Sequence, residues 1–161
     1  MTRLADLINT LIDGEVEFIL IGGVAANLHG SGRLTLDVDV VYRRSAGNLK
    51  KLVTALAPLN PYLRGVPAGL PFQWDVQTLH RSLNLTLDTS LGAIDLLAEV
   101  AGNGTWESLI AGSREIELGE RRCRVVSLPQ LIHLKRAAGR PKDFESIAEL
   151  EIILAEQDLC A

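Results

Sequence analysis

The sequence is poor in several kinds of residue, and each shortage excludes a class of protein. It has two cysteines, Cys123 and Cys160, and no CxxC spacing, which excludes a disulfide framework and a zinc site built on paired cysteines. Aromatic residues make up only 4% of the chain, so the core must consist of aliphatic side chains. The formal net charge of −4 argues against sequence-independent coating of nucleic acids, which requires a cationic surface.

Long apolar runs are also absent. The run Phe18–Ala26 is too short to span a bilayer and is interrupted by Gly22 and Gly23. The N-terminal segment carries Asp6 and Asp13 and does not have the composition of a signal peptide. We therefore expect a cytoplasmic protein without a membrane partner.

The order of the expected elements indicates an α+β fold with a small mixed β-sheet and flanking helices. Apolar spacing predicts helices over residues 4–12, 23–29, 48–57, 105–111 and 128–138, and a last helix from Pro141. Apolar or alternating runs predict strands over 16–21, 34–42, 83–87 and 93–98, and a hairpin over 114–118 and 123–126. We expect a single domain over residues 1–161, with a core over 1–126 and a C-terminal helical pair over 127–161.

Residues 60–71 break this regular pattern. Three prolines and two glycines fall within the segment: Pro61, Pro67, Pro71, Gly65 and Gly69. This composition predicts an unusually long loop, and long loops in small domains tend to be functional or mobile. We expect the loop to shape a site for an acceptor molecule.

Two acids in the second predicted strand are the strongest indication of function. Asp37 and Asp39 are two residues apart, so they point to one face of the strand, whereas Leu36, Val38 and Val40 point to the other. Like charges held side by side on a strand repel each other, and folding does not require them there. A divalent cation between them would remove that cost.

A third acid and a pair of glycines extend this pattern. Asp95 lies in the apolar run 93–98, although aspartate is disfavoured in strands and seldom buried without a partner. Three such carboxylates suit a pair of Mg²⁺ ions; alternatively, each is a strand-end acid that faces solvent or an arginine. Gly22 and Gly23, between a strand and a helix, either allow an anion to approach the backbone N–H groups or serve tight packing.

These five residues carry a resemblance to a known family. Gly22, Gly23, Asp37, Asp39 and Asp95 resemble, position by position, the glycine pair, the acid-x-acid strand and the later acid of the nucleotidyltransferase superfamily, which includes DNA polymerase β. The resemblance implies the nucleotidyltransferase fold and Mg²⁺-dependent transfer of a nucleotide from a nucleoside triphosphate to an acceptor.

Two further segments are similar to those of a narrower group. The string GRLTLDVDV and the late segment KRAAGRPKDFESIAEL resemble the small bacterial nucleotidyltransferases of abortive-infection and toxin–antitoxin systems. The residues that carry this second similarity are Arg33, Thr35, Lys135, Arg140, Lys142 and Asp143. The resemblance covers most of the chain and implies a toxin of a toxin–antitoxin system, with a cognate antitoxin as a partner.

The resemblance also implies roles for the acids and glycines. Asp37 and Asp39 would hold two Mg²⁺ ions against the triphosphate. Asp95 would join the ion that activates the attacking group, as a ligand or as a base. Gly22 and Gly23 would seat the β- and γ-phosphates.

Five other residues are expected to bind the nucleotide: Arg33, Thr35, Lys135, Arg140 and Lys142. Either Lys135 or Lys142 would neutralise charge on the leaving pyrophosphate. Arg33 either contacts the triphosphate or pairs with Asp37 or Asp39 when metal is absent.

The sequence leaves the acceptor open among a protein, a tRNA and a small hydroxylated molecule. We also expect a homodimer, because so small a domain would need a neighbour to complete the cleft. The competing interpretation is a module of the same fold that binds a nucleotide or a partner without catalysis. Retention of all three acids argues against it.

Overall fold

A seven-stranded mixed sheet forms the centre of the computed structural model, which describes residues 2–160. The strand order is β3-β4-β5-β2-β1-β9-β8. The strands are β1 (Phe18–Ile21), β2 (Asp37–Tyr42), β3 (Tyr62–Leu63), β4 (Asn84–Thr89), β5 (Gly92–Leu97), β8 (Arg114–Leu118) and β9 (Arg121–Val125). The pairs β1–β9 and β2–β5 are parallel and the others are antiparallel. The predicted α+β class with a mixed sheet is confirmed.

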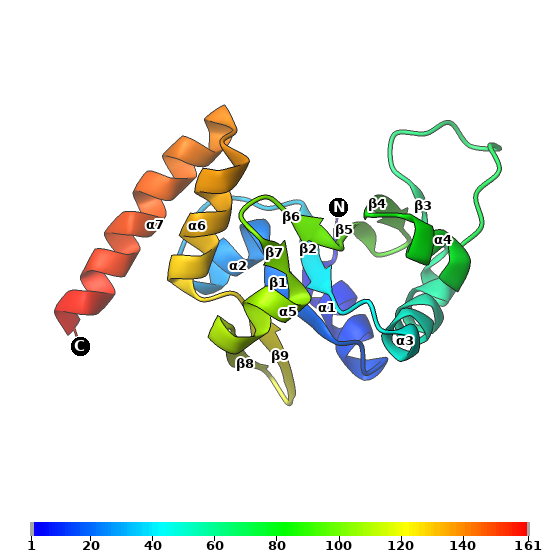
Figure 1. Ribbon diagram of the computed structural model, residues 1–161, viewed down its shortest axis with the longest axis horizontal. Helices are drawn as coiled ribbons and strands as arrows, with labels where there is room; N and C mark the ends of the chain where they lie inside the picture. Colours follow the sequence, from blue (N-terminus) through cyan, green and yellow to red (C-terminus); the bar gives the residue numbers. More distant parts are fainter. Residues whose placement is uncertain (1, 161) are drawn as a thin grey trace.

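Seven α-helices surround the sheet in the described residues (Figure 1). They are α1 (Leu4–Asp13), α2 (Gly22–Leu28), α3 (Ala46–Leu56), α4 (Val76–Arg81), α5 (Trp106–Leu109), α6 (Leu128–Ala138) and α7 (Pro141–Cys160). Helix α1 contacts β2, β5 and β9, whereas α2 contacts β1 and β2. Helix α6 packs on α2, and α7 packs on α6 as the outermost helix (Figure 1). No described helix has the length and apolar character that crossing a membrane requires.

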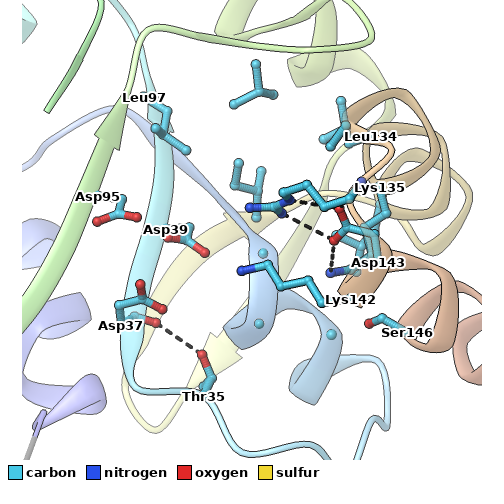
Figure 2. Close-up of a pocket in the computed structure, with 18 of the residues that line it drawn as sticks. Thr35, Asp37, Asp39, Asp95, Leu97, Leu134, Lys135, Lys142, Asp143 and Ser146 are labelled. Atoms are coloured by element: carbon cyan, nitrogen blue, oxygen red, sulfur yellow. Dashed lines mark hydrogen bonds and ion pairs between the residues drawn. The ribbon is translucent and has the colours of Figure 1, made fainter. Parts of the chain in front are cut away.

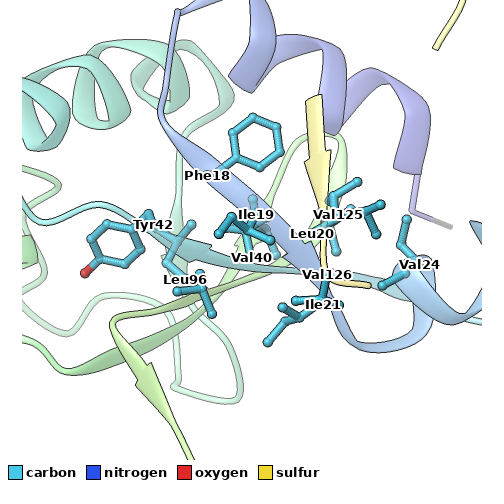
Figure 3. Packing of buried hydrophobic residues seen from close by; sticks show 14 of the residues in the cluster. Phe18, Ile19, Leu20, Ile21, Val24, Val40, Tyr42, Leu96, Val125 and Val126 are labelled. Atoms are coloured by element: carbon cyan, nitrogen blue, oxygen red, sulfur yellow. The ribbon is translucent and has the colours of Figure 1, made fainter. Parts of the chain in front are cut away.

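Aliphatic burial holds these elements together, as the shortage of aromatic residues requires. All four residues of β1 are buried, because the strand lies in the middle of the sheet between β2 and β9. Ile19 and Leu20 are fully buried and lie among Val40, Leu96 and Val125 (Figure 3). Burial of an aliphatic side chain of this size contributes on the order of 1.5–3 kcal/mol.

Local capping fixes both ends of helix α6. The Ser127 side chain accepts a hydrogen bond from the Gln130 N–H, and the Gln130 side chain accepts one from the Ser127 N–H. This capping box starts α6, and Gly139 ends it in the left-handed conformation with φ of 64°. The predicted helix over 128–138 is therefore confirmed.

The second predicted strand is shorter than expected. The spacing predicts a strand from residue 34, but β2 begins at Asp37, and Leu34 and Leu36 are 88% and 65% exposed. The reason is that residues 34–36 have no neighbouring strand to pair with. On one side, the pairing with β5 begins at Asp37, which lies opposite Ala93. On the other side, β1 ends at Ile21, which lies opposite Asp39. The prediction that Leu36 belongs to this strand, beside Val38 and Val40, is wrong.

Several short elements escaped prediction. The segment predicted as a loop over 60–71 contains the edge strand β3, which pairs with β4. Helix α4 and the two-stranded sheet of β6 (Glu99–Val100) and β7 (Gly104–Thr105) were not expected either. These elements have two to six residues, too few for hydrophobic periodicity to reveal them.

The glycine pair at the start of α2 packs directly against the second strand. Gly22 has a φ of 65°, and a Cβ atom at this position would overlap the Asp39 carboxylate. A Cβ atom on Gly23 would overlap the Thr35 hydroxyl. Because Gly22 and Gly23 have no side chains, α2 can begin directly beside the acids. Gly22 adopts the left-handed backbone conformation without strain, and neither glycine collides with Asp39 or Thr35.

We expect Gly22→Ala to lower the free energy of unfolding by about 1–3 kcal/mol, because it adds left-handed backbone strain and displaces Asp39. Gly47→Ala is the matched control: Gly47 lies in α3, and a Cβ atom there meets nothing within 4 Å. That control should be neutral or slightly stabilising. Denaturant titration of both variants measures the difference, and equal stabilities would contradict the steric role of Gly22.

Candidate functional site

Three carboxylates meet on one face of the sheet. Asp39 and Asp95 lie directly opposite each other in the parallel pairing of β2 and β5, and Asp37 precedes Asp39 by two residues on the same face. One carboxylate oxygen from each of the three lies within 4.8 Å of the others. Strand pairing thus brings together the acids that the sequence singled out, although Asp95 lies far along the chain.

This proximity changes the acidity of the central carboxyl group. Burial, followed by repulsion from Asp37 and Asp95, raises the pKa of Asp39 to about 8. Without a cation between the acids, the cluster therefore retains a proton to higher pH than an isolated carboxylate would. The site carries an electrostatic cost that a bound cation would relieve.

Asp95 has an unsatisfied atom that faces the same cluster. Its Oδ1 atom is buried and accepts no hydrogen bond, although the Arg64 Nη2 atom lies 2.8 Å away. The contact is one of charge, since Arg64 Nη2 donates its hydrogen bonds to the carbonyl oxygens of Leu87 at 2.9 Å and Ile94 at 3.4 Å. A buried oxygen with free lone pairs beside two other carboxylates is suited to a hard divalent ion.

Arg64 is the charged neighbour of the acids that sequence reasoning missed. Its Nη1 atom lies 3.7 Å from Asp37 Oδ2 and its Nε atom 3.3 Å from Asp88 Oδ1. Burial works against its charge, but the Asp95 carboxylate raises the pKa of the guanidinium above its usual value. The residues next to Arg64 in the sequence do not indicate this role, because its partners on β2, β4 and β5 are distant in the sequence.

A basic wall lies across the cavity from the acids, where α6 ends and α7 begins. Asp143 is almost fully buried, and two of its contacts organise this wall. Arg140 donates to both Asp143 oxygens, at 2.8 and 3.2 Å, and Lys135 Nζ lies 4.0 Å from Asp143 Oδ1. Burial lowers the pKa of Lys135, and the charge of Asp143 opposes that shift. The Lys142 side chain extends into the cavity, toward the side on which the acids lie (Figure 2).

Arg33 does not pair with Asp37 or Asp39, which was one of the two roles that the sequence suggested for it. Its guanidinium contacts α7, with Nη2 3.5 Å from Glu145 Oε2 and Nε 3.9 Å from Glu149 Oε1. Pairing of Arg33 with Asp37 or Asp39 is therefore wrong for this structure, and Arg64 holds that place instead. The reason is position: Arg33 lies before β2 begins, on the side of the cavity where α7 passes.

One cavity of about 770 Å³ unites the candidate residues. All ten of them line it: Gly22, Gly23, Arg33, Thr35, Asp37, Asp39, Asp95, Lys135, Arg140 and Lys142. Thr35 donates from Oγ1 to the Asp37 carbonyl oxygen at 3.3 Å, which ties the loop before β2 to the acids (Figure 2). The volume falls within the range of about 300–1,000 Å³ that is typical of small-molecule sites. The arrangement places acids on the sheet side and cations on the helical side of a space fit for a phosphorylated ligand.

The raised pKa of Asp39 predicts an unusual pH dependence of stability. The folded protein retains this proton to about pH 8, whereas in the unfolded chain the carboxyl has its ordinary pKa of 3.8. Stability is therefore lost as the pH rises between those values. In chelator, we expect Asp39→Asn to match the wild type near pH 4 and to exceed its melting temperature by several degrees above pH 8, since each kcal/mol corresponds to about 2–4 °C.

Asp13→Asn is the control, because the pKa of Asp13 is shifted in the opposite direction and its variant should change stability with the opposite sign. A hydrogen bond from Arg121 lowers the pKa of Asp13, so that carboxylate contributes stability above its unfolded pKa and the variant should lose stability as the pH rises. Thermal melts of the three proteins across pH 4–9 test both signs. A constant difference between Asp39→Asn and wild type would contradict the raised pKa.

The sequence matches no model of a protein family and no curated protein. Among solved structures, the chain is similar to the lincomycin-bound crystal structure of the lincosamide antibiotic adenylyltransferase LnuA, with a TM-score of 0.58 and 15% sequence identity. The likeness covers 92% of this chain and 94% of that one. Together with the glycine pair and the acids on β2 and β5, it confirms the predicted architecture: the chain has the nucleotidyltransferase fold.

Proposed function

We propose that the protein is a Mg²⁺-dependent nucleotidyltransferase, which moves a nucleotide from a nucleoside triphosphate to an acceptor. The observation that carries this proposal is the convergence of Asp37, Asp39 and Asp95 within 4.8 Å at the edge of a cavity with a basic opposite wall. Fold alone would be a weak basis, because one fold serves many functions.

The donor set fits a divalent ion. All three groups are carboxylates, one of them has a buried oxygen with no hydrogen bond, and one has a pKa raised to about 8 by burial and repulsion. Bound ions would stabilise charge on the entering and leaving oxygens of an in-line displacement. We propose Asp37 and Asp39 as shared ligands and Asp95 as the ligand nearest the acceptor.

The chain's cations would bind the triphosphate. We propose Lys142 as the group that meets its charge, since Arg140 and Lys135 both contact Asp143, whereas no acidic group lies within 4 Å of the Lys142 ammonium in the described part of the chain. The N–H groups of Gly22 and Gly23, at the start of α2, would approach the phosphates closely. Arg33 would have to leave Glu145 and Glu149 to join them.

For the acceptor, we propose only the chemical class. The attacking group is a hydroxyl of a protein, a tRNA or a small molecule, and the similarity to an antibiotic adenylyltransferase adds weight to a small molecule. The segment GRLTLDVDV and the late basic block are the grounds for a toxin of a toxin–antitoxin system, held in check by an antitoxin. A cytoplasmic location and a homodimer complete the proposal.

Transfer is tested with α-labelled triphosphates and Mg²⁺ in the presence of bulk tRNA, cell lysate or pooled hydroxylated small molecules. We expect wild type to label an acceptor, and Asp37→Asn and Asp39→Asn to lose at least about 100-fold in rate while remaining folded. Asp158→Asn, on the exposed end of α7, is the matched control and should retain activity. Nucleotide binding without transfer by wild type would support the non-catalytic module instead.

The toxin role makes a separate prediction. Induced expression of wild type should slow bacterial growth, whereas Asp37→Asn, expressed to the same level, should not. Growth curves with expression checked by immunoblot measure this. Unchanged growth with an active enzyme would remove the toxin role and leave the transfer reaction standing.

A further inference from the structure

A row of polar side chains crosses the sheet from β3 through β4 and β5 to β2. The row consists of Arg64, Thr86, Asp95 and Asp39. The Arg64 N–H donates to the Thr86 carbonyl oxygen at 3.0 Å, directly after β3. Thr86 lies opposite Asp95 on β5, and Asp95 lies opposite Asp39 on β2. Opposite residues share a face of the sheet, so the edge strand aims Arg64 at the acids by pairing alone.

The guanidinium contacts the acids from outside the cavity. Arg64 is not among the residues that line it, although its nitrogens lie 2.8 Å from Asp95 and 3.7 Å from Asp37. Its side chain is 29% exposed, so these charges interact in a partly desolvated setting. A cation placed there supplies part of the charge that a divalent ion would otherwise supply.

Two further groups anchor Arg64 without involving the acid triad. Nε lies 3.3 Å from Asp88 Oδ1, and Nη2 donates to the Leu87 carbonyl oxygen at 2.9 Å. Both partners belong to β4, so Arg64 is fixed to a strand beside the site. The Asp95 oxygen that it faces lies 2.8 Å from Nη2 and has no well-aligned hydrogen bond. Arg64 therefore supplies positive charge to Asp95 from a fixed position on the sheet.

We propose that Arg64 is a built-in counter-ion of the acid triad, which steadies Asp37 and Asp95 in the absence of metal and weakens divalent-ion binding by competing for their charge. This inference rests on the proposed function, since it concerns the same metal site. It predicts that the site is tuned for modest metal affinity, so that occupancy would depend on the triphosphate that arrives with the ion.

The test is calorimetric titration of the intact, nucleotide-free protein with Mn²⁺ or Mg²⁺ alone. We expect Arg64→Gln to bind the metal about tenfold more tightly than wild type, which corresponds to about 1.4 kcal/mol. Arg64→Lys keeps the charge and should stay close to wild type. Arg121→Gln is the matched control, because it breaks a two-bond pair with Asp13 outside the cavity and should leave metal affinity unchanged.

Thermal melts provide a second readout. In chelator, Arg64→Gln should melt several degrees below Arg64→Lys, and saturating Mg²⁺ should narrow that gap, because the metal takes over the missing charge. If Arg64→Gln does not fold, the same comparison is made with Arg64→Met, which keeps a long side chain, removes the charge and should likewise bind metal more tightly than wild type.

The possible outcomes separate the two proposals. Equal or weaker metal binding by Arg64→Gln would overturn the counter-ion role while leaving the metal site intact. Loss of triphosphate affinity with unchanged metal affinity would do the same, and would make Arg64 a substrate ligand. Absence of metal binding by wild type and Arg64→Gln alike would overturn this inference, whereas the proposed function stands or falls with the transfer assay.

Discussion

Repulsion among Asp37, Asp39 and Asp95 is the constraint around which this part of the molecule is organised. The parallel register of β2 and β5 sets two of these carboxylates side by side, and the buried aliphatic faces of both strands prevent them from moving apart. The cost is visible in Asp39, whose pKa rises to about 8. Burial of aliphatic side chains elsewhere in the sheet stabilises the fold enough to maintain this local strain.

Positive charge is distributed around that cluster in two different ways. Arg64 reaches the acids from the edge of the sheet and is anchored to β4, whereas Lys135, Arg140 and Lys142 belong to the helical side of the cavity. The buried Asp143 restrains two of these three cations. The glycine pair keeps the space between the two sides open, because any side chain on Gly22 would occupy the place of the Asp39 carboxylate. The acids and the basic residues of α6 and α7 thus line the same cavity from different sides (Figure 2).

Similarity to a solved adenylyltransferase establishes the fold, but 15% identity does not transfer a substrate. Nucleotidyl transfer is therefore proposed from the chemistry of the residues that line the cavity. The acids provide hard oxygen ligands, the α6–α7 junction provides cations, and the start of α2 provides backbone donors. The acceptor is a separate question, because in the proposed function these features would all serve the triphosphate and its ions.

The sequence by itself determined the elements whose signals are local. The aliphatic runs of β1 and β5, the capping box of α6, the glycine pair and the alternating acids could all be read from neighbouring residues, and ten predicted site residues line one cavity. Only the tertiary structure decided the start of β2, the pairing of Arg33 with α7 and the contact of Arg64 with Asp95. Each of these depends on which distant strand or helix lies alongside, and periodicity along the chain carries no information about such neighbours.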